Sequence, residues 1–323
     1  MVETFQGGLQ LSGTVEISIV SPVYRAEAIL PELVRRLRTA MSTMGVAYEI
    51  VLIDDRSPDG SWVVMRTLSN ETPELKCFRL SRNFGQHNTI TAGLSLAKGN
   101  WIVVMDCDLQ DRPEEIPRLY QKALESKADA VVARRAERKD TWLKRMSSRF
   151  YYSAFSYLTD TVQDPAVANF GVYNRKVIDA ILSMKDQIRY FPTMLQWVGF
   201  QREYVDVEHD ARAEGESSYN WKSLFALAFN NILAFSDKPL KLTVRFGFWI
   251  ALISLGIGIF YLVQYFMGEI DVLGFASLIV SISFFSGMNI MILGMIGLYL
   301  GKVFEKVKDR PNFIISESTN GQE

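Results

Sequence analysis

The sequence predicts an α/β domain with a mostly parallel sheet, followed by an amphipathic helix and a pair of long apolar helices. Up to about residue 132, short apolar runs alternate with stretches of helical periodicity, a pattern typical of strands joined by right-handed crossover helices. Acidic or polar loops follow several of these runs, at the edge where open α/β sheets bind ligands. Nearly all long apolar runs lie after Val244, so the chain separates into a mixed part and an apolar part.

The predicted strands and helices alternate along the first part of the chain. Strands are expected where apolar runs are bounded by turn signals, at 16–20, 48–53, 75–80, 102–105 and 130–132. Helices are expected between and after them, at 28–44, 62–68, 89–97 and 116–125. Before the last helix, Asp111 is expected to be the N-cap residue, with Pro113 in the first turn and Glu114 completing a capping box.

Residues 101–115 (WIVVMDCDLQDRPEE) contain the pattern around which the domain is organised. An apolar run ends in two carboxylates, Asp106 and Asp108, with Gln110 beside them. Carboxylate and amide oxygens are the ligands that hard divalent cations prefer. A lone D-x-D is also common in turns after strands, where Asp tolerates the local geometry. Further residues are therefore needed to support a metal site.

Two more predicted strands are followed by carboxylates, Glu27 and Asp54. A nucleotide site needs a carboxylate for a base or ribose edge and a cation for the phosphates. Asp54 fits the first task and Asp108 the second. The sequence contains no G-x-x-x-x-G-K-[ST] loop, and no G-x-G-x-x-G after the first strand. Phosphates would then be held by a metal and by arginines, unless these acids only solvate the ends of loops.

Composition excludes several other classes of protein. With 35 basic and 36 acidic residues the net charge is −1, which argues against a nucleic-acid partner. The two cysteines, Cys77 and Cys107, lie in or beside predicted strands and indicate a reducing compartment without a disulfide framework. His87 and His209 are too far apart in sequence to indicate a zinc pair. Residues 1–13 lack the basic start and apolar core of a signal peptide.

Residues 134–149 (RRAERKDTWLKRMSSR) form a strongly basic segment in an otherwise balanced chain. Arg and Lys at this density could bind a phosphate monoester, attract anionic lipid head groups or form a solvated helix face. A phosphate monoester is largely dianionic at pH 7, since its second pKa is about 6. It is already a nucleophile and needs no general base. This fits a chain with no recognisable Ser-His-Asp set or activated cysteine.

The last third of the chain has the pattern of a membrane segment. Residues 219–236 show amphipathic spacing, either of an interfacial helix or of a helix packed on the first domain. Residues 244–267 and 272–300 are each long enough to span a bilayer. Their outer flanks carry Lys and Arg but their connection does not, which predicts that both ends lie in the cytoplasm. Gly297 and Gly301 form a G-x-x-x-G step that favours close helix packing and oligomerisation.

Four stretches in this order and spacing resemble a known family. They are SPVYRAE (21–27), IDDRSPDGS (53–61), RNFGQHN (82–88) and DCDLQD (106–111). They resemble the inverting family-2 glycosyltransferases with the GT-A fold, a Rossmann-like fold. Within that family the sequence is most similar to polyprenyl-phosphate glycosyltransferases, such as bactoprenol glucosyltransferases and dolichyl-phosphate mannose synthases. The resemblance extends over about 16–313.

The resemblance implies substrates, a cofactor and site residues. The donor would be a nucleotide diphosphate sugar, the acceptor polyprenyl phosphate and the cofactor magnesium or manganese. The matching donor-binding residues are Pro22, Tyr24, Glu27, Asp54 and Asp106. The matching metal ligands are Asp106, Asp108 and Gln110, with Asp108 as the catalytic residue. The matching acceptor-phosphate residues are Arg135, Arg138, Lys144, Ser148 and Arg212, the last of them near the donor.

The sequence departs from this family's pattern at four positions. Arg25 stands where Asn is usual, Arg56 where Gly is usual, Asn169 where an acid is common and Ser218 where Lys is usual. These departures bear on donor identity and on phosphate contacts rather than on the fold.

The expected organisation is a tail (1–15), a GT-A domain (16–218), amphipathic juxtamembrane helices (219–243), two transmembrane helices (244–300) and a polar, loosely ordered cytoplasmic tail (301–323). The expected function is transfer of a sugar, first of all glucose from UDP-glucose, to undecaprenyl phosphate at the inner membrane. A homo-oligomer is expected, with a tetramer as one form found among resembling enzymes. The alternatives are a GDP-mannose-dependent mannose synthase, a processive polysaccharide synthase, whose Q-x-x-R-W motif is missing, and a catalytically silent membrane scaffold.

Overall fold

The computed structural model describes residues 14–135, 167–186, 189–207, 238–267 and 274–319. The chain divides into two compact units. The first unit consists of Met1–Met146, Gln163–Ser218 and Pro311–Glu323. The second consists of Ser147–Val162 and Tyr219–Arg310. The chain therefore returns to the first unit after passing through the second.

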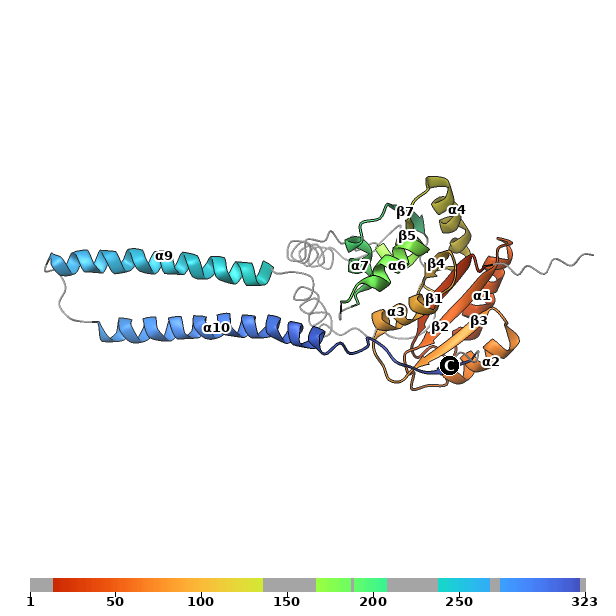
Figure 1. Ribbon diagram of the computed structural model, residues 1–323, viewed down its shortest axis with the longest axis horizontal. Helices are drawn as coiled ribbons and strands as arrows, with labels where there is room; N and C mark the ends of the chain where they lie inside the picture. Colours follow the sequence, from red (N-terminus) through yellow and green to blue (C-terminus); the bar gives the residue numbers. More distant parts are fainter. Residues whose placement is uncertain (1–13, 136–166, 187–188, 208–237, 268–273, 320–323) are drawn as a thin grey trace, which may run out of the picture. The chain divides into compact units, whose positions relative to one another are not determined.

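The described strands of the first unit form one eight-stranded sheet in the order β7-β5-β6-β4-β1-β2-β3-β8 (Figure 1). The strands are β1 (Ile17–Val23), β2 (Tyr48–Asp54), β3 (Leu75–Leu80), β4 (Trp101–Val104), β5 (Ala130–Arg135), β6 (Val167–Asn174), β7 (Arg202–Val207) and β8 (Ile315–Ser318). Parallel pairs join β4, β1, β2 and β3, and also β5 and β7. Among the described strands, only β6 and β8 run antiparallel to all their neighbours. The predicted α/β class with a mostly parallel sheet is thus confirmed.

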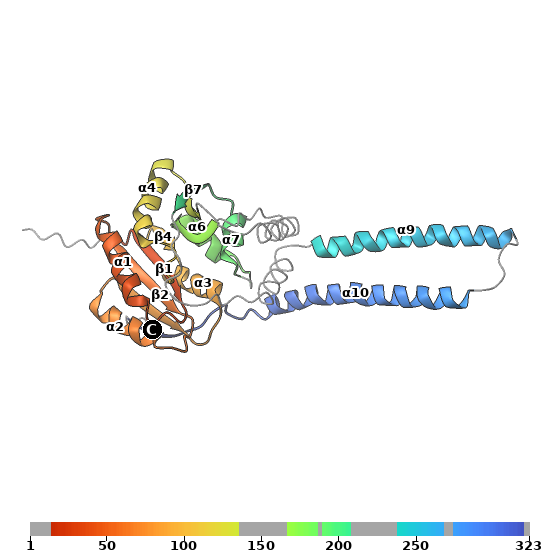
Figure 2. The ribbon, with the colours of Figure 1, turned by 180° about the vertical axis from the view of Figure 1, so that it is seen from behind.

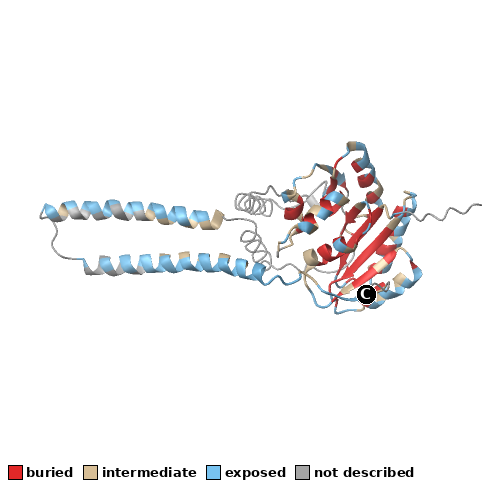
Figure 3. Cartoon of the chain, in the orientation of Figure 1, coloured by how far each residue is buried: buried red, intermediate tan, exposed pale blue. Residues whose placement is uncertain are grey.

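Helices cover both faces of this sheet, as the two opposite views in Figures 1 and 2 show. They are α1 (Leu30–Ser42), α2 (Ser61–Glu71), α3 (Gln86–Leu96), the short 3₁₀ helix η1 (Pro113–Glu115), α4 (Ile116–Ser126), α6 (Arg175–Ser183) and α7 (Phe191–Trp197). Alternate strand residues feed two cores. Ile19 belongs to the core that contains residues of α1, α2 and α4, whereas Val20 belongs to the core with α3, α6 and α7. Figure 3 shows the sheet as the most buried part of the unit.

The predicted bounds are close to the observed ones for the first strands and helices, and β3 has the predicted bounds. The expected cap at Asp111 is wrong, because the N-cap residue of η1 is Arg112, whose side chain makes no capping hydrogen bond. Glu114 instead accepts two hydrogen bonds from Arg36 of α1, at 2.8 and 2.6 Å, since α1 packs beside η1. The expectation of a loosely ordered C-terminal end is wrong for β8, which pairs with β3.

The second unit contains two long helices, α9 (Lys238–Phe266) and α10 (Phe275–Val307). Within the described residues one segment, Phe284–Val307, is long and apolar enough to cross a membrane. None of its described residues is buried in the structure. The expected two-helix transmembrane hairpin is therefore supported for one helix only.

Candidate active site

The acidic residues selected from the sequence lie at the carboxyl ends of adjacent parallel strands. Asp54 is the last residue of β2 and is fully buried. Asp106 and Asp108 follow β4, and Glu27 follows β1 in the loop that leads to α1. Because β4, β1 and β2 are parallel neighbours, their ends meet at one edge of the sheet. The fold therefore places these carboxylates at the edge where open α/β sheets bind ligands.

Hydrogen bonds join the loop after β1 to the loop after β2. The backbone N–H of Arg25 donates to Ser57 Oγ at 3.1 Å, and that of Ala26 donates to Ser61 Oγ at 3.0 Å. The N–H of Gly60 donates to Glu27 Oε2 at 2.9 Å. A Cβ added at Gly60 would lie 2.5 Å from Glu27 Oε1, so the glycine lets the carboxylate lie against the backbone.

Two of the departures from the family pattern lie in these loops. Arg25 has a φ of 54° and Arg56 a φ of 56°, which is the left-handed region. Asn and Gly, the usual residues at these positions, adopt this region readily, whereas other residues lose about 1–2 kcal/mol there. Both loops thus have the backbone conformation that suits Asn and Gly, although arginines occupy the positions.

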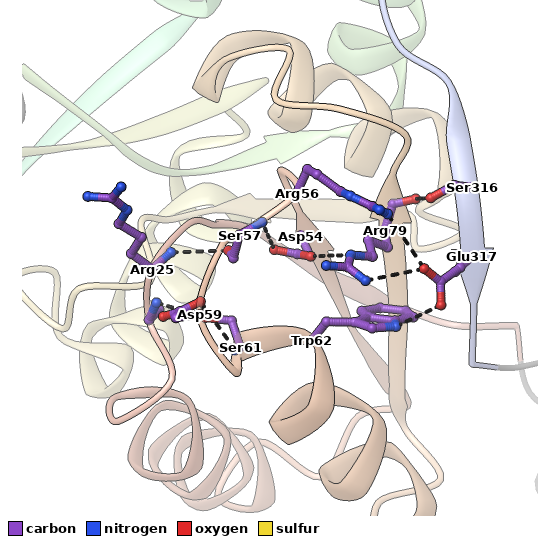
Figure 4. A network of polar contacts seen from close by, with 11 residues as sticks. Arg25, Asp54, Arg56, Ser57, Asp59, Ser61, Trp62, Arg79, Ser316 and Glu317 are labelled. Carbon is purple, nitrogen blue, oxygen red and sulfur yellow. Dashed lines mark hydrogen bonds and ion pairs between the residues drawn. The ribbon is translucent and has the colours of Figure 1, made fainter.

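Asp54 is held by its own loop and by β3. Its Oδ1 accepts a hydrogen bond from the N–H of Ser57 at 2.9 Å. Its Oδ2 lies 3.0 Å from Nε of Arg79, as an ion pair (Figure 4). The two atoms are close but not aligned as a hydrogen bond, and neither has another hydrogen-bond partner among the residues that the structure describes. The Arg79 guanidinium therefore balances the charge of the buried Asp54 carboxylate at the end of β2.

Asp55, the neighbour of Asp54, stabilises the loop before α3. Its carboxylate accepts the N–H groups of Phe84 at 2.7 Å and Gly85 at 2.9 Å, which ties the loop before α3 to the end of β2. Burial raises the pKa of Asp55, and these backbone bonds partly offset that effect. The next residue, Gln86, begins α3 and is thereby brought to the end of β4.

The two carboxylates after β4 are each oriented by an amide. Gln86 Nε2 donates to Asp106 Oδ1 at 2.7 Å, and the backbone N–H of Gln110 donates to Asp108 Oδ1 at 3.1 Å. Both acids and the Gln110 side chain are half-buried. Cys107 lies between the two acids in sequence. Burial and, to a smaller extent, the charge of Asp106 raise its pKa to about 12, although the backbone amide of Tyr24 donates to its sulfur. Cys107 is thus a neutral thiol that links the β1 loop to this turn.

This turn fits a divalent cation of the magnesium type. The described part of the chain contains no group of three His, Cys, Asp or Glu side chains that could hold a metal ion alone. Magnesium, however, is usually held by one or two protein carboxylates together with water and substrate phosphates. Asp106 and Asp108 supply two hard oxygen ligands at one strand end, as such a shared site requires.

The remaining predicted residues divide into those the structure places and those it does not describe. Pro22 is buried within β1. Tyr24 is 43% exposed, with the Arg25 guanidinium 5.5 Å from its ring centre. Arg135 ends β5. Arg138, Lys144, Ser148 and Arg212 lie outside the described residues.

Two residues at this edge were not selected from the sequence, Arg79 and Gln86. Arg79 is a basic residue near the end of a mostly apolar strand, and its charge was an available signal. Gln86 lies within the RNFGQHN stretch, but nothing in that stretch indicates contact with Asp106. His87, beside it, packs edge-on against Tyr190 with ring centroids 4.6 Å apart. Burial lowers the pKa of His87 to about 4, so it is a neutral, weakly basic ring near pH 7.

Comparison with known proteins identifies the family of this chain. Residues 18–182 match the family model described as glycosyl transferase family 2. The "SfII prophage-derived bactoprenol glucosyl transferase" of Shigella flexneri is 31% identical over 308 residues, covering 95% of this chain and 99% of that protein. An "undecaprenyl-phosphate 4-deoxy-4-formamido-L-arabinose transferase" of Pseudomonas aeruginosa (strain LESB58) is 34% identical over 304 residues, covering 93% and 89%.

A solved structure supports the fold. Glucosyl-3-phosphoglycerate synthase from Mycobacterium tuberculosis, in complex with Mn²⁺, uridine diphosphate and phosphoglyceric acid, has a TM-score of 0.50 and 13% identity. The match covers 68% of this chain and 77% of that one. The family model and the two relatives, each matched over most of its length, show that this chain belongs to glycosyl transferase family 2.

Proposed function

We propose that the protein transfers a sugar from a nucleotide diphosphate sugar to polyprenyl phosphate, with inversion at the anomeric carbon. The product is a lipid-linked monosaccharide. The observation that carries the proposal is the pair of relatives named for bactoprenol or undecaprenyl phosphate, each matched over about nine tenths of this chain or more. UDP-glucose and undecaprenyl phosphate are the first substrates to test, because one of these relatives is a glucosyl transferase.

On the donor side, Asp54 is the residue for the nucleoside. A base N–H needs a hydrogen-bond acceptor, and Asp54 supplies a carboxylate at the end of β2. Glu27 lies at the neighbouring strand end, with its carboxylate against Gly60. Pro22 and Tyr24 border the same strand end. The arrangement supports a nucleoside lying across the ends of β1 and β2.

Asp106 and Asp108, with Gln110, would hold magnesium or manganese beside the donor diphosphate. A bound cation supplies Lewis-acid stabilisation of the charge on the departing nucleoside diphosphate. The chain's own part is to orient the two carboxylates, through Gln86 and the Gln110 backbone. A phosphate acceptor is already anionic at neutral pH, so positioning and charge neutralisation carry the reaction. Neutral His87 needs no part in it.

The acceptor is a lipid, and the chain provides apolar helices for a bilayer. Phe284–Val307 spans about 36 Å at 1.5 Å per residue, enough to cross a hydrocarbon core. Exposed side chains such as Ile290 and Leu293 would face lipid. We place α9 as a second span, both termini and the catalytic unit in the cytoplasm, and the acceptor phosphate at Arg135, Arg138, Lys144, Ser148 and Arg212. The G-x-x-x-G step at Gly297 supports a homo-oligomer.

The test is a transfer assay on membranes that contain the full chain. Labelled UDP-glucose, GDP-mannose or another sugar nucleotide is supplied with magnesium or manganese and undecaprenyl phosphate. Label that enters the organic phase as a monosaccharide supports the proposal, and its donor identifies the sugar. Mannose transfer alone would assign the GDP-mannose alternative. Label in a polymer, or no transfer with any donor, contradicts the proposal.

Asp108→Ala separates catalysis from folding. We expect this variant to lose turnover by at least about 10²-fold, because one of the two carboxylate ligands of the cation is removed. Asp179→Ala is the matched control, since its carboxylate is 61% exposed on α6 and pairs with Arg175 at 3.9 Å. An active Asp108→Ala enzyme would refute the metal assignment.

A further inference from the structure

The strand β8, near the C-terminal end of the sequence, forms the edge of the sheet beside β3 and β2. It follows α10 and residues 308–314, and it pairs antiparallel with β3. The backbone contacts include Ser81 N–H to Ile314 O at 2.9 Å and Thr319 N–H to Cys77 O at 3.0 Å. Ser316 Oγ also donates to Arg79 O at 3.1 Å. An edge of the sheet that would otherwise expose unpaired backbone groups is thus covered by the chain's own C-terminal segment.

Glu317 is the residue of β8 with the most extensive polar contacts to this edge (Figure 4). Its Oε1 lies 3.3 Å from Arg79 Nη1 and 3.7 Å from Arg56 Nη1. Its Oε2 accepts the indole N–H of Trp62 at 3.0 Å. The Arg79 guanidinium also lies 5.8 Å from the centre of the Trp62 ring. One carboxylate therefore fixes Arg79, directly and through Trp62.

These contacts lead to Asp54. In the register of the sheet, Asp54 lies opposite Arg79, and Arg79 lies opposite Glu317. Residues opposite each other on neighbouring strands point to the same face. Asp54, Arg79 and Glu317 therefore form a row of acid, base and acid across β2, β3 and β8. The burial increases along the row, from a side chain 43% exposed at Glu317 to 18% at Arg79 and 0% at Asp54.

We propose that Glu317 is a positioning residue for the donor nucleoside. It holds the Arg79 guanidinium between two carboxylates and so keeps the ion-paired Asp54 carboxylate in the orientation in which it receives the nucleoside. This inference rests on the proposed function, in which Asp54 binds the donor. The inference adds Glu317 to the residues that serve the donor site. Glu317 lies in β8, the strand that follows the apolar helix α10 in the sequence.

The physical reason is competition for the guanidinium. Arg79 has five N–H donors in a planar fork, and its most favourable geometry with a carboxylate is bidentate. With Glu317 present, Nη1 donates to Glu317 of β8 at 3.3 Å, while Nε pairs with Oδ2 of Asp54 at 3.0 Å. Without the charge of Glu317, Asp54 is the remaining carboxylate of the row. The guanidinium is then expected to turn further toward Asp54 and to shift its carboxylate from the orientation that suits the nucleoside.

The test compares Glu317→Gln with the unaltered full chain in detergent. The amide keeps an acceptor for Trp62 and removes the charge. Binding of uridine diphosphate and guanosine diphosphate is measured by calorimetry with magnesium present, and donor and acceptor kinetics are measured in membranes. We expect nucleotide Kd and donor KM to rise by about threefold to tenfold, while kcat and acceptor KM stay within about twofold. A purely structural role would lower kcat through fewer folded molecules and leave donor KM unchanged.

Two further variants complete the experiment. Glu32→Gln is the matched control, because it removes an exposed Glu–Arg pair, at 2.6 Å from Arg35, on the same unit. We expect no change in nucleotide binding. In an Arg79→Met background, Glu317→Gln should have no further effect on Kd, since the group that it positions is gone.

The outcomes separate this inference from the proposed function. If the unaltered protein binds neither nucleotide, the proposed function is overturned, and the inference with it. If it binds a nucleotide and Glu317→Gln binds equally well, only the inference is overturned. A variant that lowers kcat without raising donor KM also overturns it.

Discussion

Gln86 offers the most direct test of how the carboxylates after β4 are prepared for a cation. Its side-chain amide donates to Asp106 Oδ1 at 2.7 Å, and both residues are half-buried. Gln86→Leu removes this hydrogen bond and keeps a side chain of similar size. Asp55 still accepts the N–H groups of Phe84 and Gly85, so the loop before α3 should hold its place.

The expected magnitude follows from the type of bond. A hydrogen bond to a charged group contributes about 1.5–3 kcal/mol, and residues that orient a metal ligand change metal affinity by about 10- to 100-fold. We therefore expect the manganese concentration for half-maximal turnover to rise by at least about tenfold in Gln86→Leu. Saturating metal should restore most of the activity, because both carboxylates remain.

The assay is a metal titration of sugar transfer, paired with direct manganese binding by electron paramagnetic resonance. Gln121→Leu is the matched control, because Gln121 Nε2 donates to Glu125 at the same distance, 2.7 Å, on the exposed face of α4. It should leave the titration unchanged. If Gln86→Leu shows the same half-saturation as the unaltered enzyme in both measurements, the assignment of Asp106 to the cation is refuted.

Two further predictions concern Gly60 and Glu49. The φ of −74° at Gly60 suits alanine, but a Cβ would meet the Glu27 carboxylate at 2.5 Å. Gly60→Ala should therefore raise donor KM by about fivefold, with a change in unfolding free energy below about 1 kcal/mol. An unchanged KM in donor titrations would remove Glu27 from the donor site. Burial alone would raise the pKa of Glu49, but bonds with Lys76, Ser18 and Lys98 lower it below its ordinary value. The stabilisation from Glu49 is therefore present above about pH 4.3 and lost as the pH falls through the folded-state pKa. Thermal unfolding should show a Tm gap between unaltered protein and Glu49→Gln that narrows between about pH 5 and about pH 3; a gap that widens would contradict this sign.

The sequence by itself determined the sheet and the edge where the site lies. Periodicity identifies which residues face a core, and this is why β3 has its predicted bounds and why α1 packs with the predicted face. A carboxylate directly after a parallel strand must lie at the ligand-binding edge. The positions of Asp54, Asp106 and Asp108 at one edge therefore follow from local patterns alone.

Only the tertiary structure decided which side chains meet. Strand pairing between distant segments leaves no local periodic signal, so the antiparallel insertion of β6 between β4 and β5 could not be read from the sequence. For the same reason Arg79 and Glu317, 238 positions apart, carry no mark of their contact. The contact between Gln86 and Asp106 depends likewise on how Asp55 ties its loop to β2. The spacing of hydrophobic residues specifies the core of this protein, whereas pairing between segments distant in the sequence specifies the partners of its charged groups.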